Sequence, residues 1–563
     1  MPAPPDAVTA KPVIRDEWIL RAGVLVLVGW LAVTIALPLW ALLSKSFQNA
    51  DGGFVGLANY IRYFSTPTLF GSIYNSLGVA ILTTLIVIPL AFVYAYALTR
   101  SRMRLKGLFY AAAMLPLFAP SLLSAISLIY LFGNQGLLKQ FLFGASIYGP
   151  IGITIAQVFY CFPHALIIVV TALRLSDARL YEVADALGTS KARIFRTVTL
   201  PGAKYGIINA VFVVFTLVVT DFGIAKVIGG QFNVLATDAY KQVVGQQNFE
   251  MGAVVGMVLL LPAVLAFVID RLVQSRQVAL LSARAVPFEP KPNGARDLAL
   301  MIFCLFVAGI LITVLGTAIW ASFITYWPYN LTPTFKNYAF ENFDPTGWSS
   351  YFNSLLMAAL AAVIGTAIIF SGAYLIEKSK VSAGGRSLAH LMAMLPMAVP
   401  GLVLGLGYVF FINAKWNPLG FLYGTLMVLV INSIAHFYTV AHITALTALK
   451  QIDPEFESVS ASLKVPFWRT FGRVTVPICL PAILDIAVYI FVNALTTVSA
   501  VIFLYGSSTK LAAIAIVHMD ESGATAAAAG MATMIVLTAL GAKLLHLLLD
   551  ALVFGKLQAW RRR

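Results

Sequence analysis

Charged residues are scarce in this chain, and their scarcity excludes an ordinary soluble domain. Only 11% of the 563 residues are charged, whereas a typical soluble protein has about a quarter. Hydrophobic residues make up 60% of the chain. Their long runs do not alternate with polar residues, as the strands of a membrane β-barrel would. The composition therefore predicts an all-α polytopic membrane protein.

Cysteine is rare, and the signature of a secretory leader is absent. Cys161, Cys304 and Cys479 lie in or beside apolar runs and show neither metal-site spacing nor the even number of a disulfide framework. We interpret them as packing residues. The opening stretch MPAPPDAVTAKPVIRDEW is polar and proline-rich and lacks the early apolar stretch and cleavage site of a signal peptide. We expect the first apolar run to stay in place as a membrane anchor.

A nucleotide-binding loop is also missing. The chain contains no G-x-x-x-x-G-K-[ST] pattern, the loop that holds nucleotide phosphates. The stretch LGTSKAR, which begins at Leu187, has a lysine after a glycine but lacks the first glycine and the spacing. We therefore expect no ATP hydrolysis and no bound cofactor in this chain. A membrane enzyme is also disfavoured, because no nucleophile, base and metal ligand cluster in the sequence.

Apolar runs of membrane-spanning length recur along the whole chain. A helix needs roughly 20 residues to cross the hydrocarbon core. Twelve spans are predicted, at about residues 20–43, 76–99, 109–132, 150–173, 205–228, 251–270, 298–322, 354–376, 388–411, 421–447, 479–504 and 525–551.

The basic residues indicate how these spans are oriented. The net charge is +15, and most of the 38 lysine and arginine residues fall in alternate loops, as the positive-inside rule requires. The excess is thus an orientation signal, and nucleic acid is not an expected partner. The pattern predicts a multi-pass membrane protein surrounded by lipid, with both termini and the loop 174–204 in the cytoplasm.

The sequence repeats itself. NSLGVAILTTLIVIPLAFVYAYALTR begins at Asn75 and NSLLMAALAAVIGTAIIFSGAYLIEK at Asn353; MLPLFAPSLL begins at Met114 and MLPMAVPGLV at Met394. Each unit holds six predicted spans, so the two copies must have the same orientation in the membrane. We predict a first module over 1–273, a cytoplasmic linker over 274–297 and a second module over 298–563.

Proline pairs recur at equivalent places in the two modules. Pro116 and Pro120 correspond to Pro396 and Pro400. Proline kinks a helix and frees backbone carbonyls, so these pairs are expected to shape the bundle, with a hinge role left open.

Two charged loops, 174–204 and 448–478, lie between the fourth and fifth spans of their modules. In the first loop, Asp177 can cap a short helix that Gly188 ends in the left-handed conformation. Leu180, Val183 and Leu187 would share one face of that helix. In the second loop, Asp453 can cap the matching helix. Such a helix lies either on lipid headgroups or against a partner. Its duplication favours a partner that is itself two-fold.

At these residues the chain resembles the permease subunits of binding-protein-dependent ABC importers. Their motif is Glu-Ala-Ala, three residues, Gly, nine residues, Ile, one residue, Leu-Pro. The first loop matches at Glu182, Ala184, Gly188 and Leu200-Pro201 with the right spacing, and the second departs from it. The resemblance implies an ATPase-coupling role for Glu182, Ala184, Leu187, Gly188, Pro201, Ser458, Ser460, Leu463, Lys464 and Pro477.

The resemblance also implies a location in the bacterial inner membrane, partners and a substrate class. Two copies of an ATPase subunit would bind ATP and Mg²⁺ and dock on the two loops, and a periplasmic binding protein would deliver a small solute. Fused permeases of this kind are typical of ferric-iron, thiamine and 2-aminoethylphosphonate importers. The stretch from Thr220 to Pro287 looks most like the 2-aminoethylphosphonate permeases, so we expect that substrate, with ferric iron as the alternative.

Few polar residues are candidates for the solute pathway. Asp221 near the end of the fifth span is the main one, and its alternatives are an ion pair with Lys226 or a helix-end cap. Asn493, Thr496 and Thr497 occupy the comparable region of the second module and can equally hold membrane helices together. His164 and His436 lie in the fourth spans, where a structural role is favoured.

A secondary transporter is the main rival from another class. Ion coupling would need a network of intramembrane acids, and Asp221 is nearly alone.

The two loops also differ, because Lys464 stands where the first loop has Gly188. We therefore predict an ordinary backbone conformation at Lys464, and a first loop that depends on its glycine more than the second does.

Overall fold

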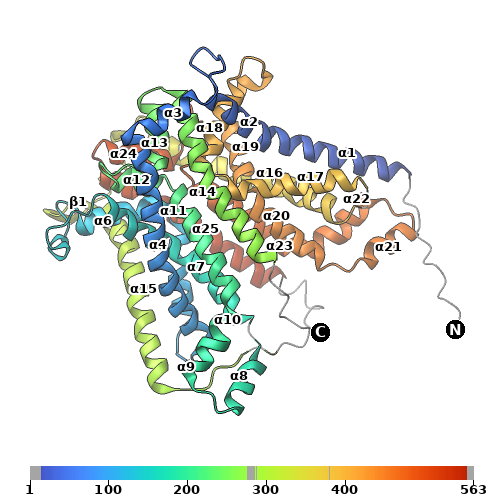
Figure 1. Ribbon diagram of the computed structural model, residues 1–563, viewed down its shortest axis with the longest axis horizontal. Helices are drawn as coiled ribbons and strands as arrows, with labels where there is room; N and C mark the ends of the chain where they lie inside the picture. Colours follow the sequence, from blue (N-terminus) through green and yellow to red (C-terminus); the bar gives the residue numbers. More distant parts are fainter. Residues whose placement is uncertain (1–13, 176, 276–285, 287, 380, 555–563) are drawn as a thin grey trace.

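The computed structural model describes residues 14–175, 177–275, 286, 288–379 and 381–554 (Figure 1). These residues are mostly helical, which confirms the predicted class. The two named β-strands of the described chain, β1 (Ile324–Tyr326) and β2 (Asn330–Pro333), form a small antiparallel hairpin.

The first half of the chain forms fourteen α-helices among the described residues. They are α1 (Ile14–Leu31), α2 (Leu37–Ser46), α3 (Ala58–Ser65), α4 (Pro67–Arg100), α5 (Lys106–Met114), α6 (Ser121–Phe132), α7 (Pro150–Arg174), α8 (Ala178–Ala186), α9 (Lys191–Ile194), α10 (Leu200–Gly202), α11 (Lys204–Thr220), α12 (Gly223–Ile228), α13 (Leu235–Tyr240) and α14 (Phe249–Ser275). Short 3₁₀ or π segments lie at Ala32–Ala36, Leu115–Phe118, Lys139–Leu142, Phe195–Thr199 and Lys241–Gly245.

In the described chain, the second half forms eleven α-helices in a similar order. Its helices are α15 (Gly294–Ser322), α16 (Gly347–Glu377), α17 (Ala383–Met394), α18 (Gly401–Ile412), α19 (Leu426–His436), α20 (Tyr438–Lys450), α21 (Glu455–Ser462), α22 (Phe467–Thr470), α23 (Val476–Thr496), α24 (Ala512–Glu521) and α25 (Thr525–Leu549). Short 3₁₀ or π segments lie at Lys336–Tyr338, Phe340–Asn342, Leu395–Ala398, Pro418–Leu422, Phe471–Thr475 and Asp550–Phe554.

Eight helices of the described chain are long and apolar enough to cross a membrane, and the number reaches twelve if each of four bent pairs is one span. The sharpest bends, 101° and 116°, separate Lys106–Phe118 from α6 and Ala383–Ala398 from α18. Pro120 and Pro400 stand at these breaks with ψ near 140°. The predicted kinks are therefore sharp turns that divide the predicted spans 109–132 and 388–411.

The fifth spans end earlier than the sequence predicts. The ranges 205–228 and 479–504 were expected to be continuous, but α11 ends at Thr220 and α23 at Thr496. The next residues, Asp221 and Thr497, are both extended, with ψ of 128° and 139°. An extended residue cannot continue a helix. Asp221 and Thr497 therefore occupy equivalent breaks in the two halves.

The repeated Asn-Ser dipeptides hold equivalent corners of the two halves. Asn75 Nδ2 donates to the carbonyl of Asn233 at 2.9 Å, and Ser76 Oγ accepts from the N–H of Leu235 at 2.8 Å. In the second half, Ser354 Oγ accepts from the N–H of Ala512 at 2.7 Å. Each serine thus satisfies a backbone donor at the start of α13 or α24.

The first span of each half packs against the other half (Figure 1). The α1–α2 span contacts α16, α17 and α18, while α15 contacts α4, α5 and α6. The approach of α2 to α18 is close, because a Cβ added to Gly407 would lie 2.7 Å from the carbonyl oxygen of Pro38. Small residues permit such approach between membrane helices. The halves are therefore interlocked.

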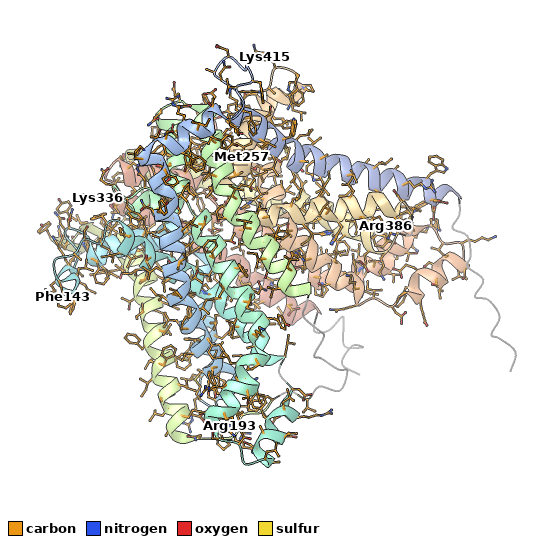
Figure 2. All side chains as sticks on the ribbon, viewed as in Figure 1. Phe143, Arg193, Met257, Lys336, Arg386 and Lys415 are labelled. Atoms are coloured by element: carbon orange, nitrogen blue, oxygen red, sulfur yellow. The ribbon has the colours of Figure 1, made fainter. Side chains whose placement is uncertain are left out.

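The two halves diverge away from the region where they meet (Figure 1). The helices α8 and α21 lie at two separate extremities, while α12 contacts α24 at the junction. There Lys226 Nζ pairs with Glu521 at 2.5 Å and lies 4.6 Å from the ring centroid of Tyr240. Figure 2 shows Arg193 and Arg386, both in predicted cytoplasmic loops, on the diverging parts.

Candidate functional site

A cavity of about 610 Å³ lies between the halves, on the side of the junction that faces α8 and α21. All four predicted pathway residues line it: Asp221, Asn493, Thr496 and Thr497. The structure thus brings together residues that are more than 270 positions apart in the sequence. Further polar residues of the lining are Ser121, Tyr160, His164, Thr216, Thr220, His436, Asp485, Tyr489, Ser499 and Lys543.

Asp221 caps a helix at the wall of this cavity. Its Oδ2 accepts from the N–H of Ile224 at 2.9 Å and from Gln157 Nε2 at 3.0 Å. Of the two structural alternatives, the cap is therefore correct, while Lys226 pairs instead with Glu521. A carboxylate held by two donors is fixed in place. Because Asp221 also lines the cavity, its structural role does not exclude contact with a solute.

The opposite wall offers amide and hydroxyl groups. Asn493 Nδ2 donates to the carbonyl of Tyr489 at 2.8 Å, and Thr496 Oγ1 donates to that of Val492 at 3.0 Å. Both bonds stay within α23, so they do not join neighbouring helices. The amide oxygen of Asn493 and the hydroxyl oxygen of Thr496 can still accept hydrogen bonds. Thr497 supplies a hydroxyl at the position equivalent to Asp221.

The two histidines of the cavity differ in their surroundings. His164 Nδ1 lies 3.2 Å from the carbonyl of Tyr160, a bond within α7 that supports the structural interpretation. His436 Nδ1 is buried without a hydrogen-bond partner among the described residues. No group of three or more histidine, cysteine or acidic side chains that could hold a metal ion occurs in the described part of the chain.

The first charged loop forms the short helix that the sequence predicts. Asp177 Oδ1 accepts from the N–H of Arg179 at 3.1 Å at the start of α8. Gly188 has a φ of +67°, and the N–H of Thr189 donates to the carbonyl of Ala184 at 3.0 Å. This closure is a Schellman motif, which requires a left-handed residue. The predicted cap and glycine are confirmed.

The second loop has the same closure, and the prediction of an ordinary backbone there is wrong. Lys464 has a φ of +55°, and the N–H of Val465 donates to the carbonyl of Ser460 at 2.9 Å. The motif needs the left-handed conformation whichever residue is present, at a cost of roughly 1–2 kcal/mol for a residue with a Cβ. Asp453 Oδ1 accepts from the N–H of Glu455 at 2.9 Å, and α21 begins at that glutamate.

Both short helices present an apolar face. Leu180, Val183 and Leu187 are 58%, 57% and 78% exposed. The equivalent residues of α21, Phe456, Val459 and Leu463, are 45%, 55% and 70% exposed. Exposed apolar patches of this kind mark sites of interaction. Within the described chain, these faces define two matching candidate docking surfaces.

The other residues of the importer motif divide into exposed and buried positions. Ala184 is 9% exposed and packs with Tyr181 and Ile194 beneath α8, so it supports the docking surface from below. Ser460 is half-buried. Exposed positions of the motif are Glu182, Gly188, Pro201, Ser458, Lys464 and Pro477.

Sequence reasoning missed the residues beneath the first helix. Arg100 is buried at the end of α4, and its guanidinium lies 4.5 Å from the ring centroid of Phe288 and 5.2 Å from that of Tyr181. Phe288 belongs to the predicted linker 274–297. The one available signal was a single aromatic residue in a basic, proline-bearing stretch.

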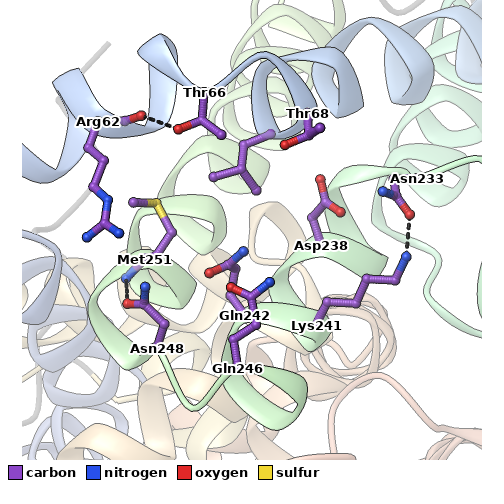
Figure 3. Close-up of a pocket in the computed structure, with 11 residues that line it drawn as sticks. Arg62, Thr66, Thr68, Asn233, Asp238, Lys241, Gln242, Gln246, Asn248 and Met251 are labelled. Carbon is purple, nitrogen blue, oxygen red and sulfur yellow. Dashed lines mark hydrogen bonds between the residues drawn. The ribbon is translucent and has the colours of Figure 1, made fainter.

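A second pocket, of about 250 Å³, lies between the start of α4 and the segment from α13 to α14 (Figure 3). The carboxylate of Asp238 points toward it, and burial raises the pKa of Asp238 to about 6. The nearby Lys241 Nζ binds Asn233 Oδ1 instead. In the equivalent corner of the second half, Lys510 pairs with Asp344 at 3.0 Å.

These features define a class of protein: a duplicated membrane transport component with a central cavity and two short helices whose apolar faces are exposed. Residues 87–278 and 372–555 both match the family model of the binding-protein-dependent transport system inner membrane component. The chain belongs to this family, as a permease with two copies of the family domain.

Two-module relatives match most of the chain. A putative ferric transport system permease protein of Haemophilus influenzae is 26% identical over 89% of this chain and 80% of its own length. A second ferric permease of that organism is 25% identical, covering 86% and 90%. A spermidine/putrescine permease of Escherichia coli is 24% identical over 42% of this chain and 90% of itself.

One solved structure is an alginate ABC transporter in complex with its oligosaccharide-bound periplasmic protein. A chain of that complex is 17% identical and covers 48% of this chain and 98% of its own, with a TM-score of 0.40.

Proposed function

We propose that this chain supplies both halves of the membrane part of a bacterial importer for ferric iron, driven by two copies of a separate ATPase subunit. The carrying observation is the cavity between two interlocked halves, each of which also displays an exposed apolar helix. Family membership establishes the permease role. The ATPase, the periplasmic binding protein and the substrate are the proposed part.

Alternating access accounts for the arrangement of the halves. The ion pair of Lys226 with Glu521 closes the junction, and the cavity lies beyond it, between the diverging parts. If α8 and α21 face the cytoplasm, as the basic residues predict, this is the inward-facing state. Two ATPase subunits that close on ATP would draw α8 and α21 together and open the junction to the periplasm. ATP and Mg²⁺ would bind to those subunits.

Ferric iron is favoured as the solute by the relatives and by the cavity. The relatives that cover most of the chain are named as ferric permeases. The cavity carries the carboxylates of Asp221 and Asp485 and two phenol groups, whereas Lys543 is the only lysine or arginine of its described lining. Oxygen ligands suit a hard cation such as ferric iron. A phosphonate group would instead be expected to bind arginine or lysine side chains.

2-Aminoethylphosphonate remains the second candidate, because the stretch from Thr220 to Pro287 resembles permeases for that compound. The comparisons with known proteins give no support for this substrate. Asp221 could pair with the ammonium group of the compound, so the cavity does not exclude it.

Growth of a deletion strain separates the two substrates. We expect the strain to fail on iron-limited medium and to grow normally on 2-aminoethylphosphonate as sole phosphorus source. A plasmid-borne copy of the gene should restore growth on iron-limited medium. The reverse pattern would replace ferric iron by the phosphonate. Purification from the membrane tests the class: an importer permease should retain an ATPase subunit, and a chain that transports iron without one would be a secondary transporter.

A further inference from the structure

The link between the halves makes a structured contact with the first docking helix, α8. The N–H of Ala178 donates to the carbonyl of Val286 at 2.9 Å, and the N–H of Val286 approaches Asp177 Oδ1 at 3.4 Å. Farther along, Lys291 Nζ pairs with Asp185 at 2.9 Å. These contacts join the linker to both ends of a nine-residue helix.

Phe288 fills the space between these contacts. Its ring centroid lies 4.4 Å from that of Tyr181, on the buried side of α8. Phe288 and Val198 pack against the small core of Tyr181, Ala184 and Ile194. The side of α8 opposite its exposed apolar face therefore rests partly on a residue of the linker.

Phe288 also covers a buried cation. Arg100 is 4% exposed, and its described polar partners are the carbonyl of Leu173 at 2.7 Å and the hydroxyl of Tyr181 at 3.4 Å. Its guanidinium lies over the face of Phe288. A desolvated guanidinium over a ring is held by the negative face of the ring. Without Phe288, a buried charge would lose one of its partners, which is costly.

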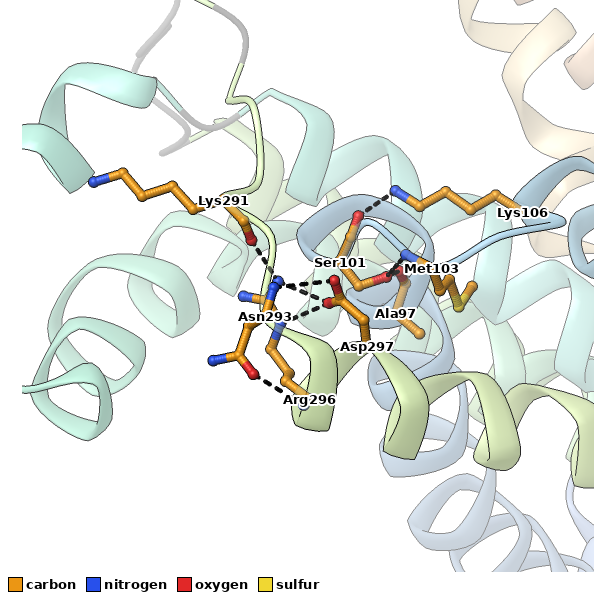
Figure 4. A network of polar contacts seen from close by, with 8 residues as sticks. All are labelled: Ala97, Ser101, Met103, Lys106, Lys291, Asn293, Arg296 and Asp297. Atoms are coloured by element: carbon orange, nitrogen blue, oxygen red, sulfur yellow. Dashed lines mark hydrogen bonds and ion pairs between the residues drawn. The ribbon is translucent and has the colours of Figure 1, made fainter.

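The far end of the linker is anchored to α15. Arg296 Nη2 donates to the carbonyl of Lys291 at 2.8 Å and pairs with Asp297, while Asn293 Oδ1 accepts from the N–H of Arg296 at 3.1 Å (Figure 4). Asp297 also accepts from the backbone N–H of Arg102 in the turn after α4. The described linker residues thus connect α8 to the first span of the second half.

We propose that the linker residues Val286, Phe288 and Lys291 position α8 for docking of the ATPase, with Phe288 as the main positioning residue and Lys291 as a lesser one. This inference rests on the proposed ATPase partner. The linker holds the first docking helix against the end of α4, so that the force applied to α8 moves the first half and α15 together. Lys291 contributes less because exposed ion pairs are weak.

The equivalent position in the second half is stabilised differently. Lys378, the counterpart of Arg100, pairs with Glu457 of α21 at 3.3 Å and donates to the carbonyl of Ile452 at 3.0 Å. Glu457 is the counterpart of Tyr181. The cation under α21 therefore has a charged partner on α21 itself, whereas the cation under α8 contacts the neutral Tyr181 of α8 and Phe288 of the linker.

The test uses the purified complex of the full chain with its ATPase and iron-loaded binding protein in proteoliposomes. We expect Phe288→Ala to lower iron transported per ATP hydrolysed at least fivefold. Phe288→Tyr, which keeps the ring, should retain more than half of the wild-type ratio. Glu289→Ala, at an exposed neighbouring position, is the matched control and should equal the wild type. Lys291→Ala should lower the ratio less than twofold.

A covalent link separates positioning from folding. Ala178 and Val286 are joined by a backbone hydrogen bond, so cysteines at both positions can be cross-linked. Oxidation should restore the transport ratio in the Phe288→Ala background, and reduction should abolish the rescue. An unchanged ratio in Phe288→Ala, or a formed cross-link without rescue, would overturn the proposal. A wild-type chain that binds no ATPase would instead refute the proposed function.

Discussion

The two halves of this permease share backbone geometry at positions where their side chains differ. Gly188 and Lys464 both adopt the left-handed conformation that ends a docking helix. Asp221 and Thr497 both end a fifth span in an extended conformation. The two halves therefore have the same backbone conformation at these positions, although different side chains occupy them. Equal shape therefore does not imply equal chemistry.

The differences lie where polar groups meet. The first half has a carboxylate at the cavity, a linker aromatic under α8 and, in the pocket beside α13, Asp238, for which the described residues provide no ion pair. The second half has a hydroxyl, a lysine–glutamate pair and the Lys510–Asp344 pair at these places. Exchanging side chains between the halves therefore tests which differences carry function.

Changes in the exposed apolar faces of α8 and α21 are expected to have the largest effect, and the effect should be similar in the two halves. Leu187→Glu and Leu463→Glu each place a charge at the most exposed apolar residue of a candidate docking surface, and a buried unpaired charge is costly. We expect each variant to lower retention of the ATPase at least tenfold on purification. Leu187→Met and Leu463→Met are the controls. A loss in only one half would show that docking is one-sided.

The cavity is expected to respond unequally. Asp221→Ala removes a helix cap and a charge, and we expect iron transport to fall at least fivefold while the ATPase stays bound. Thr497→Ala should reduce transport less than twofold. Asp221→Asn tests charge against capping, because asparagine is also a good cap. Full activity of Asp221→Asn would show that the carboxylate charge has no part in transport.

Asp238 in the first half and Asp344 in the equivalent corner of the second half are expected to affect stability with opposite pH dependence. Asp238 has a folded pKa of about 6, above its ordinary 3.8, so its buried charge costs stability above pH 6 and nothing below about pH 4. Asp238→Asn should therefore stabilise the chain at pH 8 by about 1–2 kcal/mol, with the gain vanishing at pH 4. Thermal unfolding in detergent at both pH values measures this.

The pKa of Asp344 is shifted in the opposite direction from that of Asp238. Burial raises its pKa, but hydrogen bonds from Thr346 and Lys510 outweigh this and hold the pKa below its ordinary value. Its charge therefore stabilises the folded state above the unfolded pKa, and the contribution is lost as the pH falls through the folded pKa. Asp344→Asn should destabilise at pH 8. The same sign of change for both variants at pH 8 would contradict the contrast.

The smallest effect concerns the helix ends. Lys464→Gly should stabilise the second loop by about 1 kcal/mol or less, because glycine adopts a positive φ without strain. Gly188→Lys should destabilise the first loop by a similar amount, since no atom lies within 4 Å of an added Cβ and only the backbone strain remains. Equal unfolding temperatures for wild type and Lys464→Gly would argue against strain at Lys464.

Local patterns predicted the elements well and their ends less well. The caps at Asp177 and Asp453 and the glycine at Gly188 were predictable because each acts through its own backbone within a few residues. Lys464 was misjudged because side-chain type was used to infer backbone conformation, while the hydrogen bonds of the motif dictate it. The spans were overextended at Thr220 and Thr496 because hydropathy does not detect an extended residue inside an apolar run.

The membrane class, the duplication and the two charged loops could be predicted from the sequence, because hydropathy, repetition and capping are local properties of the chain. Three features appear only in the folded structure: the first spans pack across the halves, Asp221 lines a cavity shared with the second half, and Phe288 lies under α8. These contacts join residues far apart in the sequence, and they form because side chains must pack tightly and buried charges need partners. Arg100 is the clearest example, because this buried cation lies against an aromatic ring of the linker.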